Sequence, residues 1–290
     1  MNELFGAIEA GGTKFVCATG TAAGEILQRV RIPTGDPADT ISQVAAFFRS
    51  QPPVSAIGIG SFGPLQLDPR SSQYGFITST PKTAWVQFDL LGAVRAAAGV
   101  PVAIDTDVNA AALGESRWGA GRGVRSFVYV TVGTGIGGAL MADGTLLRGR
   151  SHLEMGHIRI PSPDSFPGIC PYHGNCLEGL ASGPAIEARW NIAAEHLPLD
   201  HPAWPLEIEY LAHACANWIC TLVPERVILG GGVMRAELFP PLRARVRELL
   251  NDYLPLPPLN EYLVPSPLAG NAGILGALEL AVSRAIPQLT

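Results

Sequence analysis

Residues 4–20, LFGAIEAGGTKFVCATG, are the stretch of sequence that decides the fold. Apolar side chains run along LFGAIEA and resume along KFVCATG, with Gly11 and Gly12 between them. Two apolar strand patterns joined by adjacent glycines predict a β-hairpin. Because glycine lets backbone N–H groups approach an anion closely, this turn and the Thr13 hydroxyl also suit a phosphate. From this stretch alone, the turn can be interpreted either as a plain hairpin turn or as a phosphate-binding turn.

A second stretch with the same layout lies at residues 126–144, SFVYVTVGTGIGGALMADG. It again reads as strand, Gly/Thr turn and strand, with Thr134 and Gly135 in the turn. A strand follows these glycines, whereas a dinucleotide fingerprint requires a helix there. The pair of hairpins therefore predicts a duplicated α/β fold of two lobes, each of which offers one turn to the same polyphosphate.

The composition indicates a folded protein of one large domain or two ordinary ones. Of the 290 residues, 47% are hydrophobic, which is enough for a core and excludes disorder. The net charge is −5 and basic residues do not cluster, which argues against a nucleic-acid partner. The apolar runs are too short to cross a bilayer, and the N-terminus carries an acid where a signal peptide carries positive charge. We expect a cytoplasmic protein that contacts no membrane.

Residues 100–116, VPVAIDTDVNAAALGES, predict a strand that leads directly into a helix. Asp105, Asp107 and Asn109 follow the apolar strand residues, so Asp107 falls at the strand end or in the first helical turn. A carboxylate there can cap the helix, bind a metal or act as a general base. The residues alone favour the helix cap over the other two roles.

Residues 227–234, VILGGGVM, predict a buried strand followed by a glycine triplet at a helix start. A triplet in that position permits close approach of a flat ligand or a phosphate. Near the C-terminus, NAGILGALELAVSRA predicts a helix over Asn271–Ala285 whose small residues imply tight packing against another element.

Residues 154–178, EMGHIRIPSPDSFPGICPYHGNCLE, gather the residue types of a metal site. Cys170, His173 and Cys176 are spaced C-x2-H-x2-C, and His157 lies 13 residues before Cys170. Two thiolates and two imidazoles form a tetrahedral zinc ligand set. The stretch therefore predicts a zinc site in a proline-rich loop.

A disulfide between Cys170 and Cys176 is the alternative to zinc, and the expected reducing compartment disfavours it. With four protein ligands the site is closed, which favours a structural role over hydrolysis. Glu154 and Glu178 stand at the two ends of the loop. Their position suggests that the ion shapes a neighbouring site.

Seven motifs occur in the order found in the ROK sugar kinases: EAGGTK, GIGSFGP, DTDVNAAALGE, TVGTGIGG, EMGH, CPYHGNCLEG and VILGGGV. The chain resembles this family over almost its whole length. The CPYHGNC loop, with EAGGTK and STPKTAW, resembles the zinc-containing bacterial ROK fructokinases most. The resemblance implies an actin-like ATPase (ribonuclease H-like) α/β fold, with two lobes and a cleft between them. It implies an N-terminal lobe of residues 1–115, completed by a C-terminal helix at 271–290, and a second lobe of residues 116–270.

The resemblance also implies transfer of the γ-phosphoryl group of MgATP to a sugar hydroxyl, with D-fructose as the expected sugar. Asp107 matches the catalytic base. The positions that match ATP-binding loops are Gly11, Gly12, Thr13, Thr134, Gly135, Gly231 and Gly232. Lys14, next to the first of these loops, is a further candidate for a contact with the phosphates. The positions that match sugar contacts are Asn109, Glu154, His157 and Glu178. The zinc ligands of the family match His157, Cys170, His173 and Cys176.

Two positions depart from the broad family pattern. Glu9 stands where the family usually has an aspartate that helps to hold Mg²⁺ through water, so Glu9 is a candidate for an indirect magnesium contact. Thr106 stands where an asparagine often precedes the catalytic aspartate. Both departures look like the fructokinase branch.

Three alternatives accompany this interpretation. The first is a ROK kinase for glucose, mannose or an N-acetylhexosamine, because sugar choice depends on pocket geometry. The second is a non-catalytic, sugar-sensing ROK protein, which the early start of the first hairpin disfavours. The third is a zinc hydrolase, which the closed ligand set disfavours. Relatives suggest a homodimer.

Overall fold

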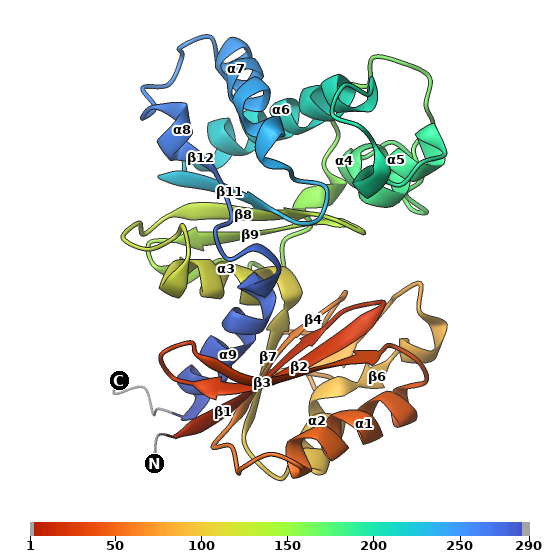
Figure 1. Cartoon of the computed structure of the whole chain (residues 1–290), viewed down its shortest axis with the longest axis vertical. Coiled ribbons are helices and arrows are strands. Elements are labelled where there is room, and N and C mark those ends of the chain that lie inside the picture. The colour runs from red at the N-terminus through yellow and green to blue at the C-terminus, as the bar shows by residue number, and fades with distance from the viewer. Residues whose placement is uncertain (1–2, 286–290) are drawn as a thin grey trace. The chain divides into compact units, whose positions relative to one another are not determined.

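The computed structural model describes residues 3–285 and divides into two compact units (Figure 1). One unit contains the chain up to Gly119, the short segment Arg148–His152 and the chain from Gly270 onward. The other contains Ala120–Leu147 and Leu153–Ala269. Residues 286–290 of the predicted C-terminal helix lie outside the described residues.

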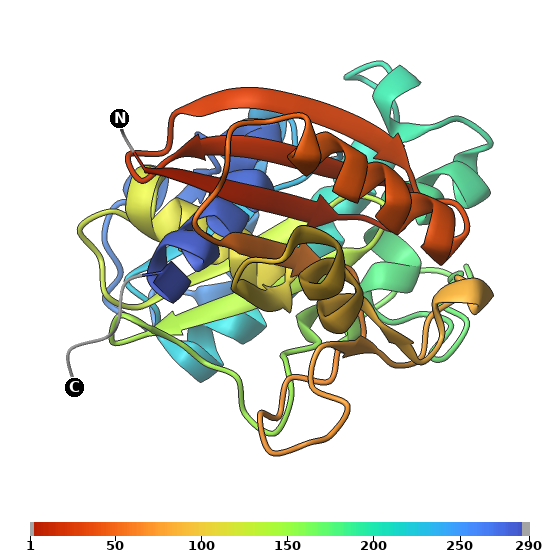
Figure 2. The same cartoon turned by 90° about the horizontal axis from the view of Figure 1, so that it is seen from below.

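The first unit is built on a five-stranded sheet with the strand order β3-β2-β1-β4-β7. β1 pairs with β2, and β2 with β3, in antiparallel fashion, whereas β1, β4 and β7 are parallel to one another. Figure 2 shows β1, β2 and β3 side by side. The strands are β1 (Leu4–Ala10), β2 (Lys14–Thr21), β3 (Ile26–Pro33), β4 (Ile57–Ser61) and β7 (Val102–Thr106). The first predicted hairpin is therefore confirmed.

Helices cover both faces of this sheet, because successive side chains of a strand point to opposite sides. Phe5 and Ala7 of β1 pack in one cluster with helix α9 (Ala272–Ala285). Ile8 and Ala10 pack in another with α1 (Pro37–Arg49) and α2 (Leu90–Ala98). The near-continuous burial of β1 follows from these two layers.

Helix α3 (Asp107–Trp118) packs against α9 through glycine on both helices. A Cβ atom on Gly114 would lie 2.5 Å from the carbonyl oxygen of Ala272. A Cβ atom on Gly276 would lie 1.5 Å from the carbonyl oxygen of Ala110. The tight packing predicted from the small residues of the final helix is confirmed.

The second unit is built on another five-stranded sheet, with the strand order β10-β9-β8-β11-β12. β8 pairs with β9 in antiparallel fashion and with β11 in parallel fashion, and β12 lies parallel to β11. The second predicted hairpin is thus confirmed. The strands are β8 (Phe127–Val132), β9 (Ile136–Ala142), β10 (Thr145–Leu146), β11 (Arg226–Gly230) and β12 (Leu263–Pro265).

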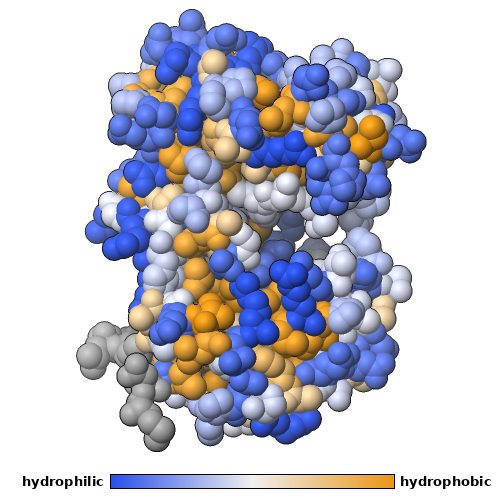
Figure 3. Space-filling view, viewed as in Figure 1, coloured by the Kyte–Doolittle hydropathy of each residue, from blue (hydrophilic) through white to orange (hydrophobic). Residues whose placement is uncertain are grey.

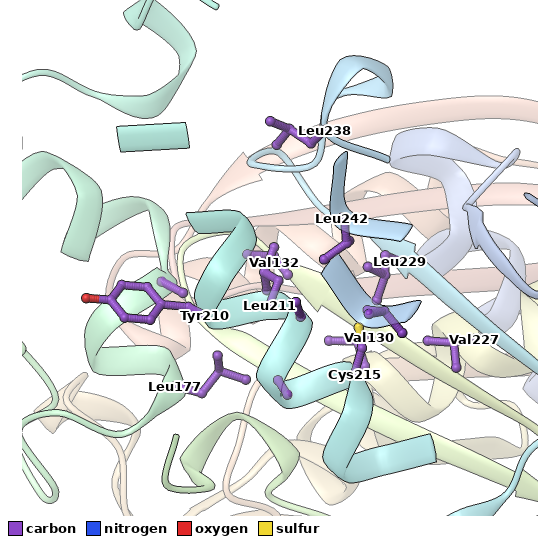
Figure 4. Close-up of a cluster of buried hydrophobic side chains, with 14 of the residues drawn as sticks. Val130, Val132, Leu177, Tyr210, Leu211, Cys215, Val227, Leu229, Leu238 and Leu242 are labelled. Atoms are coloured by element: carbon purple, nitrogen blue, oxygen red, sulfur yellow. The ribbon is translucent and has the colours of Figure 1, made fainter. Parts of the chain in front are cut away.

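One core joins this sheet to the helices α4 (Leu177–Ala181), α6 (Ala203–Leu222) and α7 (Phe239–Leu250). Valine and leucine side chains of β8 and β11 meet apolar side chains of the three helices. Figure 4 labels the central members of this cluster, among them Val130, Val132, Val227, Leu229, Leu177, Leu211, Cys215 and Leu242.

The remaining elements are short. They are strands β5 (Phe76–Ile77) and β6 (Phe88–Asp89), helices α5 (Gly183–Trp190) and α8 (Leu259–Tyr262), and 3₁₀ turns at Thr83–Trp85, Met155–His157, Ala194–His196, Ala236–Leu238 and Ala269–Asn271.

The glycine triplet after β11 does not begin a helix, contrary to the prediction. The chain turns at Gly231, which has a φ of +95°, and the next regular element is the 3₁₀ turn that begins at Ala236. A Cβ atom on Gly231 would lie 2.2 Å from the carbonyl oxygen of Val132. The glycine is therefore required by close packing against the end of β8, which apolar periodicity does not reveal.

Across residues 3–285, no helix combines the length and the apolar character that a membrane crossing requires. Figure 3 shows hydrophilic residues over the visible face of each unit, with hydrophobic residues between them.

The contact between α3 and α9 gives the first prediction. We expect Gly276→Ala to lower the free energy of unfolding by about 1–3 kcal/mol, because the added methyl group has no space beside Ala110. Chemical denaturation monitored by circular dichroism measures this change. Gly270→Ala is the control, because a Cβ atom there would meet nothing within 4 Å. Equal stability of the two variants would contradict the packing argument.

Candidate functional site

The first Gly/Thr turn connects β1 to β2 and is held by its own backbone and by Thr34. The N–H group of Gly11 donates to the carbonyl oxygen of Lys14 at 3.0 Å. The Thr34 hydroxyl donates to the carbonyl oxygen of Gly11 at 2.7 Å, and the Thr34 N–H group donates to that of Thr13 at 3.0 Å. A Cβ atom on Gly12 would meet nothing within 4 Å, so one side of the turn is open. Three hydrogen bonds therefore hold the turn, and the space beside Gly12 has room for a ligand atom.

A buried tryptophan, Trp85, supports the first Gly/Thr turn through the residue that follows Thr34. The indole N–H of Trp85 donates to the carbonyl oxygen of Gly35 at 3.0 Å, next to Thr34. Its ring contacts those of Phe15, Phe62 and Phe88. Sequence reasoning did not assign Thr34 or Trp85 to the site, because both act through residues far from them in the chain.

Asp107 is the first residue of α3 and is not its N-cap. The Thr106 hydroxyl caps the helix by accepting from the N–H group of Asn109 at 3.1 Å. The Asp107 carboxylate accepts from the N–H group of Val108 at 2.8 Å. The expectation that Asp107 caps the helix is therefore wrong, because the Thr106 hydroxyl fills that role.

Burial raises the pKa of Asp107 to about 6. The negative charge of Glu9 adds to this increase, whereas the Val108 hydrogen bond and the positive charge of His152 oppose it. A carboxylate with this pKa is ionised at neutral pH and is still a useful base.

Glu9 is half-buried and lies against the first turn of α9. Its carboxylate oxygen would be 2.7 Å from a Cβ atom on Gly273. Burial raises the pKa of Glu9, and the charges of Arg29 and Lys14 partly oppose that effect. Because burial disfavours its charged form, a cation nearby would stabilise the ionised carboxylate.

Asp105 and Asn109 form a buried hydrogen-bonded pair on either side of Asp107. The Asn109 amide donates to one carboxylate oxygen of Asp105 at 2.6 Å, and the Thr106 N–H group donates to the same oxygen at 2.8 Å. Arg148 binds the other oxygen at 2.7 and 3.2 Å. The pair fixes the junction between β7 and α3, and Asn109 itself is 1% exposed.

In the second unit, Glu178 supports the second Gly/Thr turn. The Gly133 N–H group donates to the carbonyl oxygen of Gly135 at 2.9 Å, while the Thr134 side chain is exposed. The N–H group of Ile136 donates to the Glu178 carboxylate at 2.9 Å. The other oxygen of Glu178 is 3.9 Å from Nε2 of His157, one of the predicted metal ligands.

The turn formed by the glycine triplet lies beside the second Gly/Thr turn. A Cβ atom on Gly133 would be 3.9 Å from the backbone nitrogen of Gly232. Gly231 packs against the end of β8, whereas a Cβ atom on Gly232 would meet nothing within 4 Å. The second unit thus presents two adjacent glycine turns with open space at Gly232.

The predicted metal ligands come together. One ligand atom from each of His157, Cys170, His173 and Cys176 lies within 4.8 Å of the others. Nδ1 of His157 is 3.4 Å from Sγ of Cys176 and 3.8 Å from Sγ of Cys170, which is 3.5 Å from Nδ1 of His173. All five cysteines are free thiols, so the disulfide alternative is not realised.

These distances fit a tetrahedral zinc ion. Zn–S bonds of about 2.3 Å and Zn–N bonds of about 2.0–2.1 Å at tetrahedral angles separate sulfur and nitrogen ligands by about 3.5 Å. The three measured S–N distances lie close to that value. Arg159 braces the loop by donating to the carbonyl oxygen of His173 at 2.8 Å. The donor set and its geometry therefore suit zinc.

With Nδ1 of His157 turned toward the thiols, Nε2 faces two carboxylates. It is 3.8 Å from Glu154 and 3.9 Å from Glu178. The second unit thus brings together the three predicted sugar-contacting residues of the loop. Asn109, the fourth, belongs to the first unit.

The family comparison matches the description ROK family to residues 5–284 of this chain. A fructokinase from Pediococcus pentosaceus is 46% identical over 281 residues, which cover 96% of this chain and 97% of that protein. A fructokinase from Lactococcus lactis subsp. cremoris is 42% identical over 289 residues, which cover 98% of each.

Among solved structures, a ROK family glucokinase from Streptomyces griseus in complex with glucose and AMPPNP is 26% identical, with a TM-score of 0.77. The alignment covers 97% of this chain and 99% of that one. The actin-like ATPase fold that the family resemblance implies is confirmed.

The cysteine and histidine cluster gives the second prediction. We expect one equivalent of zinc per chain in the purified protein, and loss of that zinc in Cys176→Ser because a hydroxyl is a poor substitute for a thiolate ligand. Mass spectrometry of the metal content measures both. Cys220→Ser is the control, because Cys220 is an exposed thiol outside the cluster. A zinc-free native protein of full stability would contradict the assignment.

Proposed function

The chain belongs to the ROK family, and we propose that it is a kinase that transfers the γ-phosphoryl group of ATP to D-fructose. The products would be fructose 6-phosphate and ADP. The observation that carries the choice of sugar is the difference in identity between the relatives. The fructokinases are 46% and 42% identical to this chain, whereas the glucokinase of known structure is 26% identical.

Backbone N–H groups of the two Gly/Thr turns, at Gly11–Thr13 and Thr134–Gly135, would bind the phosphates of ATP. Thr34 and Glu178 would keep these turns in a binding conformation before ATP arrives. Gly231 and Gly232 would approach the adenosine, with the open space at Gly232 as the supporting observation. Lys14 is exposed at the first turn and would add positive charge there.

Asp107 would act as the general base of the reaction. Its carboxylate accepts the proton of the sugar hydroxyl while that oxygen attacks the γ-phosphorus and ADP leaves from the opposite side. Its position at the head of α3 and its raised pKa support this role. Val108 and the capped helix hold it in a fixed orientation.

Magnesium would be held by the phosphate oxygens and, through water, by Glu9, and would neutralise phosphate charge during transfer. Zinc would be held by His157, Cys170, His173 and Cys176 and would have a structural role. With Nδ1 of His157 committed to the metal, Nε2 is left to meet a sugar hydroxyl together with Glu154 and Glu178. The cytoplasmic location and the homodimer stay predictions of the sequence.

A substrate panel tests the proposed function. We expect the chain to release ADP fastest with fructose, compared with glucose, mannose and N-acetylmannosamine at equal concentration, because the fructokinase relatives are more similar to it than the glucokinase is. A coupled assay of ADP release with saturating MgATP measures the rates. A preference for another hexose would overturn the sugar assignment and leave the kinase assignment intact, whereas no turnover with any of them would overturn both.

The assignment of Asp107 gives a further prediction. We expect Asp107→Asn to retain fructose binding and to lose about 10²–10⁴ in turnover, the usual contribution of a general base. In the native enzyme, kcat/KM should fall as the pH drops below about 6, because protonation of Asp107 removes the base. Steady-state kinetics over a pH series measures both.

Asp143→Asn is the matched control, since Asp143 is exposed and pairs with Arg125 at the protein surface. Turnover of Asp107→Asn within threefold of the native rate would rule out the assignment.

A further inference from the structure

The chain leaves the second unit for only five residues, Arg148–His152, between the β9–β10 hairpin and the metal loop. These residues belong to the first unit, the one that holds Asp107. Arg148 and His152 stand at the two ends of the segment, and no family motif in the sequence assigns either of them a role.

Arg148 anchors this segment to a buried acid. Its guanidinium donates from Nε and Nη2 to one oxygen of Asp105, at 3.2 and 2.7 Å. The Asp105 side chain is 0% exposed. The second Asp105 oxygen accepts from the Thr106 N–H group and from the Asn109 amide. Thr106 caps α3 and Asn109 lies in its first turn, so these residues flank Asp107. One carboxylate therefore fixes both the segment and the helix start.

The anchored segment brings the imidazole of His152 to the edge of the sheet where Asp107 lies. Nε2 of His152 is 3.9 Å from the point that a Cβ atom on Gly63 would occupy. β4 and β7 are parallel, with Ser61 opposite Thr106, so Gly63 and Asp107 both follow the same edge. The positive charge of His152 also reaches Asp107 and opposes the increase in its pKa.

The carboxyl ends of parallel strands are where open α/β sheets bind ligands. An imidazole offers one hydrogen-bond donor and one acceptor when neutral, which suits a sugar hydroxyl. Nδ1 of His152 lies 3.0 Å from the Ser151 hydroxyl, so that neighbour orients the ring. Because residue 63 is glycine, no side chain starts from the Cβ position that lies 3.9 Å from Nε2.

We propose that His152 contacts the sugar, beside the hydroxyl that Asp107 deprotonates, and that Arg148 and Asp105 are positioning residues that hold it there. This inference rests on the proposed sugar kinase activity and adds an acceptor-binding residue to it. The ligand is the hexose itself, bound through its hydroxyl groups.

Sugar titration and kinetics test the proposal. We expect His152→Ala to weaken binding of the preferred hexose at least tenfold in calorimetric titration and to raise its KM by the same factor, while the KM for ATP changes less than twofold. His152→Gln, which keeps a donor and an acceptor, should recover part of the affinity. Arg148→Lys, which keeps the charge but lacks the second donor group, should raise the KM for the sugar in the same way.

Two surface variants serve as controls. His196→Asn alters an exposed histidine and Arg125→Lys alters an exposed ion pair, both in the second unit, and both should leave the sugar KM unchanged. Native-like sugar binding by His152→Ala would overturn the proposal, and so would equal loss of sugar and ATP affinity. The substrate panel on the native chain tests the proposed function separately, because a preference for another hexose or an absence of turnover would appear there. In that case the titrations of the variants are made with the sugar that the native chain binds best.

Discussion

The parallel pairing of β1, β4 and β7 is the constraint on which the candidate site of the first unit depends. Ala10, Ser61 and Thr106 are aligned across the three strands, so the chain leaves all of them at one edge of the sheet. The first Gly/Thr turn and the head of α3 both start there. Any change that shifted one strand by a residue would move a whole face of side chains and would separate these groups.

Two carboxylates, those of Asp105 and Asp107, lie at the same edge of the sheet, and their surroundings differ. Asp105 is fully buried and is compensated by Arg148, Asn109 and a backbone N–H group. Asp107 has less compensation, so burial raises its pKa to about 6. This contrast suits Asp105 to a structural role and Asp107 to the proposed role of general base.

In the second unit, one acid contacts both the second Gly/Thr turn and the loop of the proposed zinc site. Glu178 accepts from the first N–H group of β9 with one oxygen and approaches His157 with the other. The proposed zinc ion therefore has a use beyond stabilising its own loop. It would fix the orientation of His157, and Glu178, which lies between His157 and the second Gly/Thr turn, would link that orientation to the turn.

The sequence by itself determined the two hairpins, the helix that starts at Asp107 and the four cysteine and histidine residues that cluster in the structure. Each rests on local spacing: adjacent glycines between apolar runs, a strand pattern that changes to a helical one, and the C-x2-H-x2-C motif. The helix start predicted at the glycine triplet was wrong, because Gly231 is required by a contact with Val132 of a different strand. Only the tertiary structure decided that Thr34, Trp85 and Arg148 support the site, since each acts through a hydrogen bond to a residue distant in the chain. Local patterns record how the backbone turns, whereas such contacts exist only after the sheet has brought distant segments together.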